Sequence, residues 1–134
     1  FDFHSAKDGE EIKLGKLSIK VLHTPGHTME STCYLLMDEA GKQVALFSGD
    51  TLFNAGAGNC HGGGHPEALY TTFSEIFSKL ADNTQIYPGH DYIVNNLKKC
   101  KRERDRVVLV NHRIGADMYE FCTPLTSMSR SLQC

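Results

Sequence analysis

Alternating apolar and polar positions predict a series of strands in the first third of the chain. Residues 17–23 (LSIKVLH) place Leu17, Ile19 and Val21 between polar neighbours, which is typical of a strand with one buried face. Residues 8–13 (DGEEIK) are expected to supply a turn and a partner strand before it. Two further strands are predicted, joined by a hairpin turn at 38–42 (DEAGK), and they cover residues 32–37 (TCYLLM) and 43–47 (QVALF).

An amphipathic helix is predicted after a glycine-dense loop at 54–65 (NAGAGNCHGGGH). Pro66 suits the first turn of this helix, because its missing N–H has no helical partner there in any case. The apolar residues that follow recur at i, i+4, i+7, i+8 and i+11, as one stripe of an α-helix: Leu69, Phe73, Ile76, Phe77 and Leu80. Residues 85–87 (QIY) predict a short buried strand. The helix then acts as a crossover, so this strand should lie parallel to the one before it.

The C-terminal part of the chain is less regular. Residues 98–106 (KKCKRERDR) form a mixed-charge run that predicts a solvated helical face. Nucleic-acid binding is not expected there, because Glu103 and Asp105 interrupt the run and no aromatic residues lie between the charges. Residues 107–110 (VVLV) suit a strand, and no periodicity follows Gly115.

Composition narrows the class of protein. A chain of 134 residues with 40% apolar and 22% charged residues fits one globular domain. A formal charge of -2 gives no general attraction to nucleic acid or anionic lipid, and no apolar run approaches 18 residues. The five cysteines include no CxxC pair, which favours reduced thiols in the cytoplasm or the mitochondrial matrix.

Three candidate metal ligands follow strands that are predicted to run in the same direction. Because such strands end at one edge of a sheet, their loops should meet there. The candidates are His27, Asp50 and His90, and each comes directly after a glycine that permits a tight turn. A single histidine or aspartate in a loop is more often a surface residue or a turn former. Two imidazoles and a carboxylate in three matching loops favour a metal site suited to zinc, iron or manganese.

Other polar residues near these loops have simpler interpretations. His23 ends a strand and is expected to be structural, and the threonines at 24, 28 and 51 are expected to support the metal-binding imidazoles. Cys60, His61 and His65 lie close together in the glycine-dense loop. They could form a second metal site, but a flexible cover over the main site is favoured. The glycines there also suit a phosphate cradle, although no GK[ST] signature accompanies them.

Three segments resemble the metallo-β-lactamase superfamily, and in particular its hydroxyacylglutathione hydrolase (glyoxalase II-like) branch. They are residues 24–36 (TPGHTMESTCYLL), 47–59 (FSGDTLFNAGAGN) and 86–97 (IYPGHDYIVNNL), within a likeness that covers residues 10–97. The resemblance implies an α/β fold, an αβ/βα sandwich of mixed sheet and flanking helices, with a dinuclear site for Zn2+ (or iron or manganese) at one edge. It implies that His27 binds one metal, that His90 binds the other, and that Asp50 bridges both.

The family's HxHxDH motif, which supplies the other ligands, is absent before residue 17. Residues 1–97 are therefore expected to form the C-terminal half of such a domain, followed by a charged helical segment and divergent tail at 98–134. Each metal would keep only two protein ligands, so the chain alone should bind metal weakly or not at all. A bare sheet face should remain, and a complementing N-terminal half or second chain is the expected partner.

The resemblance implies hydrolysis of a thioester by metal-activated water, with Asp50 as the catalytic carboxylate. Tyr92 matches the family's substrate-contacting tyrosine, whereas Asn59 and His61 stand where the family places a lysine and a tyrosine that hold glutathione. A hydroxyacylglutathione-like thioester or related small acyl substrate is expected. Two alternatives stay open. One is a persulfide dioxygenase-like enzyme with a single iron, which would leave His90 off the metal. The other is a catalytically incomplete subunit or fragment.

Overall fold

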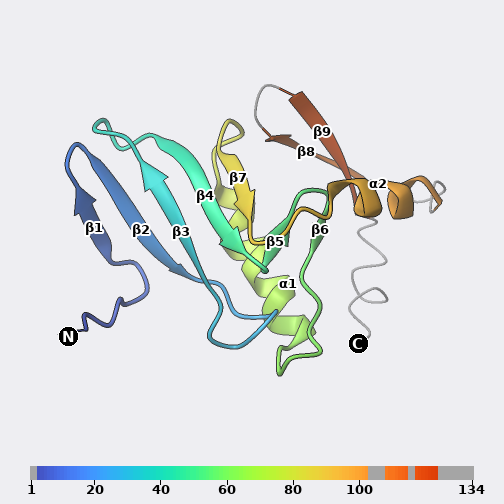
Figure 1. Cartoon of the computed structure of the whole chain (residues 1–134), viewed down its shortest axis with the longest axis horizontal. Coiled ribbons are helices and arrows are strands. Elements are labelled where there is room, and N and C mark those ends of the chain that lie inside the picture. The colour runs from blue at the N-terminus through green and yellow to red at the C-terminus, as the bar shows by residue number, and fades with distance from the viewer. Residues whose placement is uncertain (1–2, 103–107, 115–116, 124–134) are drawn as a thin grey trace.

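The computed structural model describes residues 3–102, 108–114 and 117–123, with side chains from 3 to 98. Its main element is a five-stranded mixed sheet in the order β1-β2-β3-β4-β7 (Figure 1). The first four strands pair antiparallel with their neighbours, and β7 pairs parallel with β4. The strands are β1 (Glu11–Leu14), β2 (Leu17–His23), β3 (Thr32–Met37), β4 (Gln43–Gly49) and β7 (Gln85–Pro88). The predicted strand directions are therefore confirmed.

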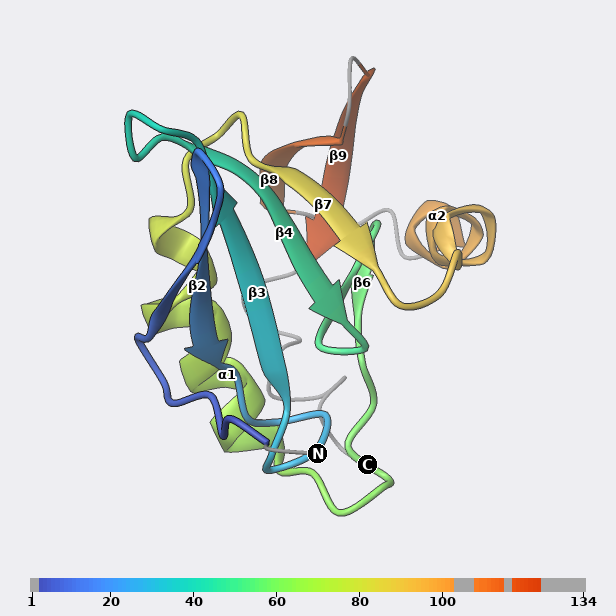
Figure 2. The same cartoon turned by 60° about the vertical axis from the view of Figure 1, so that its left-hand side comes forward.

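A helical layer covers one face of this sheet (Figure 2). Helix α1 (Pro66–Glu75) begins at Pro66, as predicted, but it ends earlier than the apolar stripe. The last part of the stripe lies in a separate 3-10 turn, η1 (Phe77–Lys79), so the expectation of one continuous helix is wrong. Serine and threonine hydroxyls along α1 donate to its own backbone carbonyls, and such bonds compete with regular helix geometry. The stripe still points at the sheet, since Phe77 is buried there.

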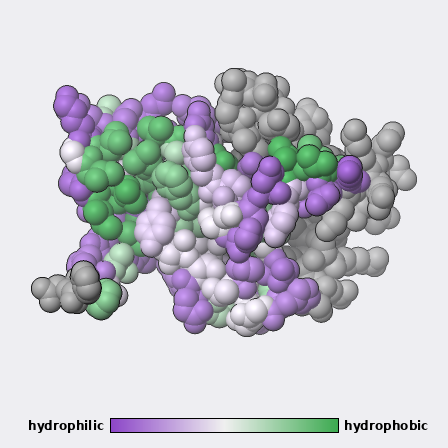
Figure 3. Space-filling model, viewed as in Figure 1, coloured by the Kyte–Doolittle hydropathy of each residue, from purple (hydrophilic) through white to green (hydrophobic). Residues whose placement is uncertain are grey.

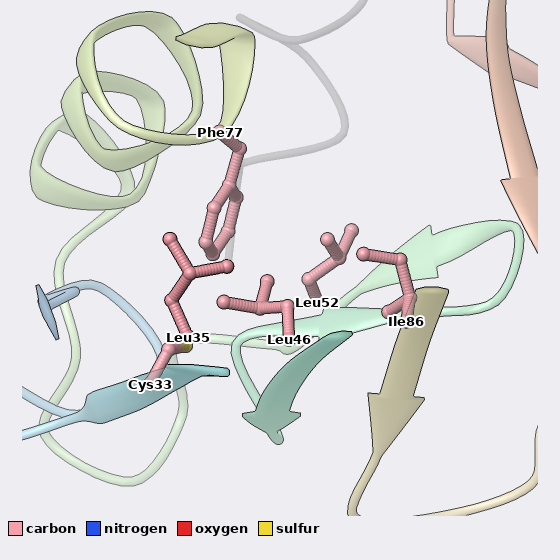
Figure 4. Close-up of a cluster of buried hydrophobic side chains, with 6 residues drawn as sticks. All are labelled: Cys33, Leu35, Leu46, Leu52, Phe77 and Ile86. Atoms are coloured by element: carbon pink, nitrogen blue, oxygen red, sulfur yellow. The ribbon is translucent and has the colours of Figure 1, made fainter. Parts of the chain in front are cut away.

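The core lies between these two layers. Register places Leu35 opposite Leu46, and Leu46 opposite Ile86, so one face of β3, β4 and β7 is continuously apolar. A cluster of buried side chains fills the space beneath the helical layer (Figure 4): Cys33, Leu35, Leu46, Leu52, Phe77 and Ile86. Burying these side chains stabilises the sheet and fixes the direction in which its loops leave it.

The opposite face of the sheet is apolar and exposed. Cross-strand pairing puts Tyr34 beside Phe47, and Phe47 beside Tyr87, with the last two rings stacked at 5.6 Å. These three side chains are 41%, 44% and 49% exposed. The face continues over β2 through Leu17 and over β1 through Ile12 and Leu14, and Figure 3 shows apolar surface gathered over this part of the sheet. Within the part of the chain that the structure describes, this is the bare sheet face expected from the sequence.

The remaining described elements are short. Strands β5 (Leu52–Phe53) and β6 (Gly56–Ala57) form a hairpin directly after β4, and helix α2 (Ile93–Arg102) follows β7. Strands β8 (Val108–Ile114) and β9 (Asp117–Thr123) pair antiparallel. The first agrees with the strand expected at 107–110, and the second lies where no element was predicted. Residues 103–106 of the predicted charged helix fall outside the described residues. Among the described helices, none has the length and apolar character needed to cross a membrane.

Candidate metal centre

The three candidate ligands come together at one edge of the sheet. They leave β2, β4 and β7 at the ends where these three strands finish, which is where the parallel directions of the strands require them to meet. Oδ2 of Asp50 lies 3.8 Å from Nε2 of His27 and 3.4 Å from Nε2 of His90. Both imidazoles therefore approach the same carboxylate oxygen.

These distances suit donors that share a metal ion. Two ligands bound to zinc at about 2.0–2.1 Å with a tetrahedral angle stand about 3.4 Å apart. The His90–Asp50 pair has this separation, and the His27–Asp50 pair needs a somewhat wider angle. Within the part of the chain that the structure describes, no group of three or more histidine, cysteine, aspartate or glutamate side chains is arranged to hold a metal ion by itself. The geometry is thus two imidazole–carboxylate pairs with one shared oxygen, and the ligand roles stay predictions.

His27 is held in a defined orientation. Its Nδ1 lies 2.7 Å from the carbonyl oxygen of Asn59, and a carbonyl can only accept, so Nδ1 carries the proton. In the neutral ring Nε2 keeps its lone pair and faces Asp50, and this is the tautomer that a metal ligand needs. The expectation that a threonine supports this ring is wrong. A backbone carbonyl from the glycine-dense loop supports it instead.

Two of the three threonines, Thr24 and Thr51, form a buried layer below the site, whereas the Thr28 hydroxyl contacts that of Ser31. Oγ1 of Thr24 lies 3.1 Å from the thiol of Cys33 and 3.5 Å from Oγ1 of Thr51, and the Cys33 thiol also donates to the carbonyl of Ser48. Burial raises the pKa of the Cys33 thiol, while hydrogen bonds from Thr24 and Thr51 act in the opposite direction. These contacts join the ends of β2, β3 and β4. The thiol stays protonated near neutral pH, so this layer is structural.

Glycines let the loops pack closely around the ligands. Gly49 adopts a positive φ of 50°, the left-handed region that glycine tolerates best, immediately before Asp50. A Cβ atom at Gly89 would lie 2.7 Å from Oδ1 of Asp50. A Cβ atom at Gly58 would collide with the backbone carbonyl of Asp50 and would lie 2.9 Å from Nδ1 of His27. The glycine-dense loop therefore lies against the site as its wall.

His90 is held mainly by aromatic contacts. Its side chain is 54% exposed, and its ring stacks on Tyr92 with a centroid separation of 5.3 Å. Phe53 meets Tyr92 edge-on at 5.1 Å and lies 6.4 Å from the ring of His90. Tyr92 is 43% exposed beside the metal-site edge, a position from which its phenol could meet a small molecule. Its substrate-binding role stays a prediction.

The other polar residues of the loops have local roles. The Asn59 side chain accepts a hydrogen bond from the backbone N–H of His61, and both side chains are exposed, so their predicted substrate contacts stay predictions. The backbone N–H of His65 donates to the carbonyl of Gly26, which closes the glycine-dense loop over the first ligand loop. His23 contacts the carbonyl of Met29 through Nε2, as a structural histidine would. A second metal cluster in this loop is not found among the described side chains.

The sequence is similar to those of proteins named hydroxyacylglutathione hydrolase. It is 56% identical over 93 residues to a hydroxyacylglutathione hydrolase from Polaromonas sp., and the match covers 69% of this chain and 34% of that protein. It is 56% identical over 90 residues to a hydroxyacylglutathione hydrolase from Nitrosococcus oceani, and this match covers 66% of this chain and 33% of that protein. The chain therefore spans about a third of the length of these curated relatives. No protein-family model matches it.

Solved structures agree on the fold. A metallo-β-lactamase from Staphylococcus aureus superposes with a TM-score of 0.60 at 35% identity, over 66% of this chain and 28% of that one. ETHE1 from Myxococcus xanthus gives 0.58 at 28% identity, over 96% of this chain and 44% of that one. TTHA1623, solved in a di-iron-bound form, gives 0.51 at 30% identity, over 67% of this chain and 41% of that one.

The mixed sheet, its flanking helices and the position of the site define part of the metallo-β-lactamase fold. Within that superfamily the chain is hydroxyacylglutathione hydrolase-like, as its three loop motifs predicted.

Proposed function

We propose that this chain supplies one part of the metal site of a thioester hydrolase that acts on a hydroxyacylglutathione-like substrate. The observation that carries the proposal is the shared oxygen of Asp50, which two imidazoles approach at 3.4 and 3.8 Å. The names of the curated relatives support the thioester as the substrate class.

His27, Asp50 and His90 would hold the metal, because two imidazole nitrogens and a carboxylate suit zinc, with iron or manganese as alternatives. The TTHA1623 neighbour in its di-iron-bound form supports a dinuclear arrangement and keeps iron among the candidates. When bound, the metal would lower the pKa of a water molecule and polarise the thioester carbonyl.

The residues of this chain have separate tasks in that reaction. Asp50 offers one oxygen to both imidazole sides of the site, so it sets the spacing between them. His27 is locked by the Asn59 carbonyl and presents a fixed lone pair. Tyr92 lies next to His90 and can orient the substrate through its exposed phenol. A thiolate leaves readily, so the site needs no strong general acid for the leaving group.

The proposal also requires a partner that covers the exposed sheet face and supplies the missing metal ligands. Two imidazole–carboxylate pairs leave each metal short of the three protein ligands that catalytic zinc sites usually have. The apolar sheet face with Tyr34, Phe47 and Tyr87 is also left exposed by the described residues. We propose that an N-terminal half, or a second chain that supplies the same elements, covers this face and brings the remaining ligands. The reduced thiols expected from the cysteine pattern suit a cytoplasmic or mitochondrial-matrix setting.

The proposal is tested by complementation. The chain would be co-expressed with the part of the Polaromonas hydrolase that it does not match, and metal content and hydrolysis of a hydroxyacylglutathione would be measured. We expect bound metal and turnover, with Asp50→Asn lowering turnover about a hundredfold or more. Asp82→Asn, in an exposed loop, is the matched control and should leave both unchanged. A complex that forms but contains no metal and cleaves no thioester would refute the proposal.

The persulfide dioxygenase-like alternative would keep His90 off the metal. The 3.4 Å separation between Nε2 of His90 and Oδ2 of Asp50 supports the hydrolase proposal, in which His90 is a ligand. Iron content and oxygen consumption with a glutathione persulfide, without thioester cleavage, would favour that alternative. A non-catalytic subunit, in contrast, would show neither metal nor turnover in any complex.

A further inference from the structure

We propose that Asn96 is a positioning residue that holds His90 against Asp50, by clamping helix α2 to the turn between β5 and β6. This inference rests on the proposed metal site. It concerns two of the three ligand loops, since Asp50 lies just before β5 and His90 just before α2.

One side chain joins these two segments. Nδ2 of Asn96 donates to the backbone carbonyl of Asn54 at 3.3 Å, in the turn between β5 and β6. The backbone N–H of the same residue donates to the carbonyl of Tyr92 at 2.9 Å, which begins the helix two residues after His90. Asn96 therefore contacts the segment after Asp50 and the segment after His90.

Asn96 packs closely on the turn between β5 and β6, and the backbone of this turn is strained at Ala55. A Cβ atom at Gly56 would lie 2.7 Å from Nδ2 of Asn96, so the amide packs directly on that glycine. Ala55 is buried and adopts a φ of 62°, a left-handed conformation that disfavours residues with a Cβ atom. Such a conformation persists only where the surroundings hold it. Among the described side chains, Asn96 supplies the hydrogen bond to this turn.

The turn controls His90 through aromatic contacts. Phe53, the residue before the turn, is buried and packs edge-on against Tyr92, which stacks on His90. His27 has a second anchor in the Asn59 carbonyl, whereas among the described residues His90 is held by its ring contacts and by Asp50. Loss of the clamp should therefore displace His90 and leave His27 in place.

The test uses diamagnetic Zn2+ alone as the probe, with this chain in solution and the ring 15N signals of the histidines observed by NMR, because the coordination shift of a ring nitrogen reports on that ring alone. Weak binding is measurable in this way. For the unaltered chain we expect Zn2+ to shift the Nε2 signals of both His27 and His90. In Asn96→Ala we expect the shift of the His90 signal to fall about tenfold at the same Zn2+ concentration, with little change at His27. Asn96→Asp removes the donor with nearly the same shape and should behave like the alanine variant.

Asn95→Ala is the matched control, because Asn95 is an exposed neighbour in the same helix. It should leave both histidines unchanged. An unchanged Zn2+-induced shift at His90 in Asn96→Ala, or an equal loss of shift at His27 and His90, would overturn the inference.

A second measurement keeps the two proposals separate. If Zn2+ shifts neither histidine in the unaltered chain, the metal proposal is judged by the metal content of the complemented complex, and the clamp is judged by the nuclear Overhauser effect between the Phe53 and Tyr92 rings. Loss of that effect in Asn96→Ala, with the amide signals of the five-stranded sheet unchanged, supports the clamp. A retained effect overturns it.

Discussion

Nδ1 of His27 donates to the backbone carbonyl of Asn59 across a sequence separation of 32 residues. This bond connects the first ligand loop to the glycine-dense loop, and it fixes which nitrogen of the ring faces Asp50. The carbonyl can reach the ring because Gly58, next to Asn59, has no side chain to occupy the space between Asp50 and His27.

Gly58→Ala should therefore destabilise the fold. Its Cβ atom would meet the Asp50 carbonyl and the His27 ring, and overpacking against rigid groups lowers the free energy of unfolding by about 1–3 kcal/mol. Gly62→Ala is the control, because a Cβ atom there has no heavy atom within 4 Å, and its effect should stay within about 0.5 kcal/mol. Urea unfolding measures both. Equal effects from the two substitutions would contradict the packing described for the loop.

Cys33 should resist alkylation in the folded chain. Burial raises the pKa of its thiol, so the reactive thiolate is scarce at pH 8. We expect iodoacetamide to modify Cys33 much more slowly in the native chain than in the same chain unfolded in urea, as measured by peptide mass spectrometry. Rapid labelling of Cys33 without unfolding would show that the layer of Thr24 and Thr51 is open to solvent.

The same thiol predicts a dependence of stability on pH. A raised pKa in the folded state means that folding favours the protonated thiol. The stabilisation is complete below the ordinary value of 9.0 and is lost as the pH rises through the raised value. The free energy of unfolding should therefore fall above about pH 9, and Cys33→Ala should remove this part of the pH dependence while lowering stability at every pH. An unchanged pH slope in that variant would exclude Cys33 as the source.

The apolar sheet face should make the isolated chain self-associate at high concentration, because an exposed patch that spans several strands favours association. Phe47→Gln should weaken this association in sedimentation experiments, since Phe47 lies between Tyr34 and Tyr87 on that face. Tyr70→Gln removes a similarly exposed ring from helix α1 and should have no effect. Should Tyr70→Gln weaken association as much as Phe47→Gln does, the contact would lie elsewhere.

The sequence predicted the strands and turns that have a clear pattern of apolar, polar and turn-forming residues. Alternation from Leu17 to Val21 identifies β2, and the tight turn before β4 reverses the chain. The resulting strand directions bring His27, Asp50 and His90 to one edge. The hairpin of β5 and β6 was not predicted, because two-residue strands show no periodicity. The partner of His27 was missed for a different reason. It is a backbone carbonyl, and every residue type carries one.

Zinc addition followed by 15N NMR of the histidine rings tests the central claim most directly. If His27, Asp50 and His90 hold metal together, zinc should shift the Nε2 signals of both histidines, and Asp50→Asn should weaken both shifts. The proton on Nδ1 of His27 should remain, because it bonds to the Asn59 carbonyl. Shifts confined to His61 and His65, with His27 and His90 unchanged, would contradict the account.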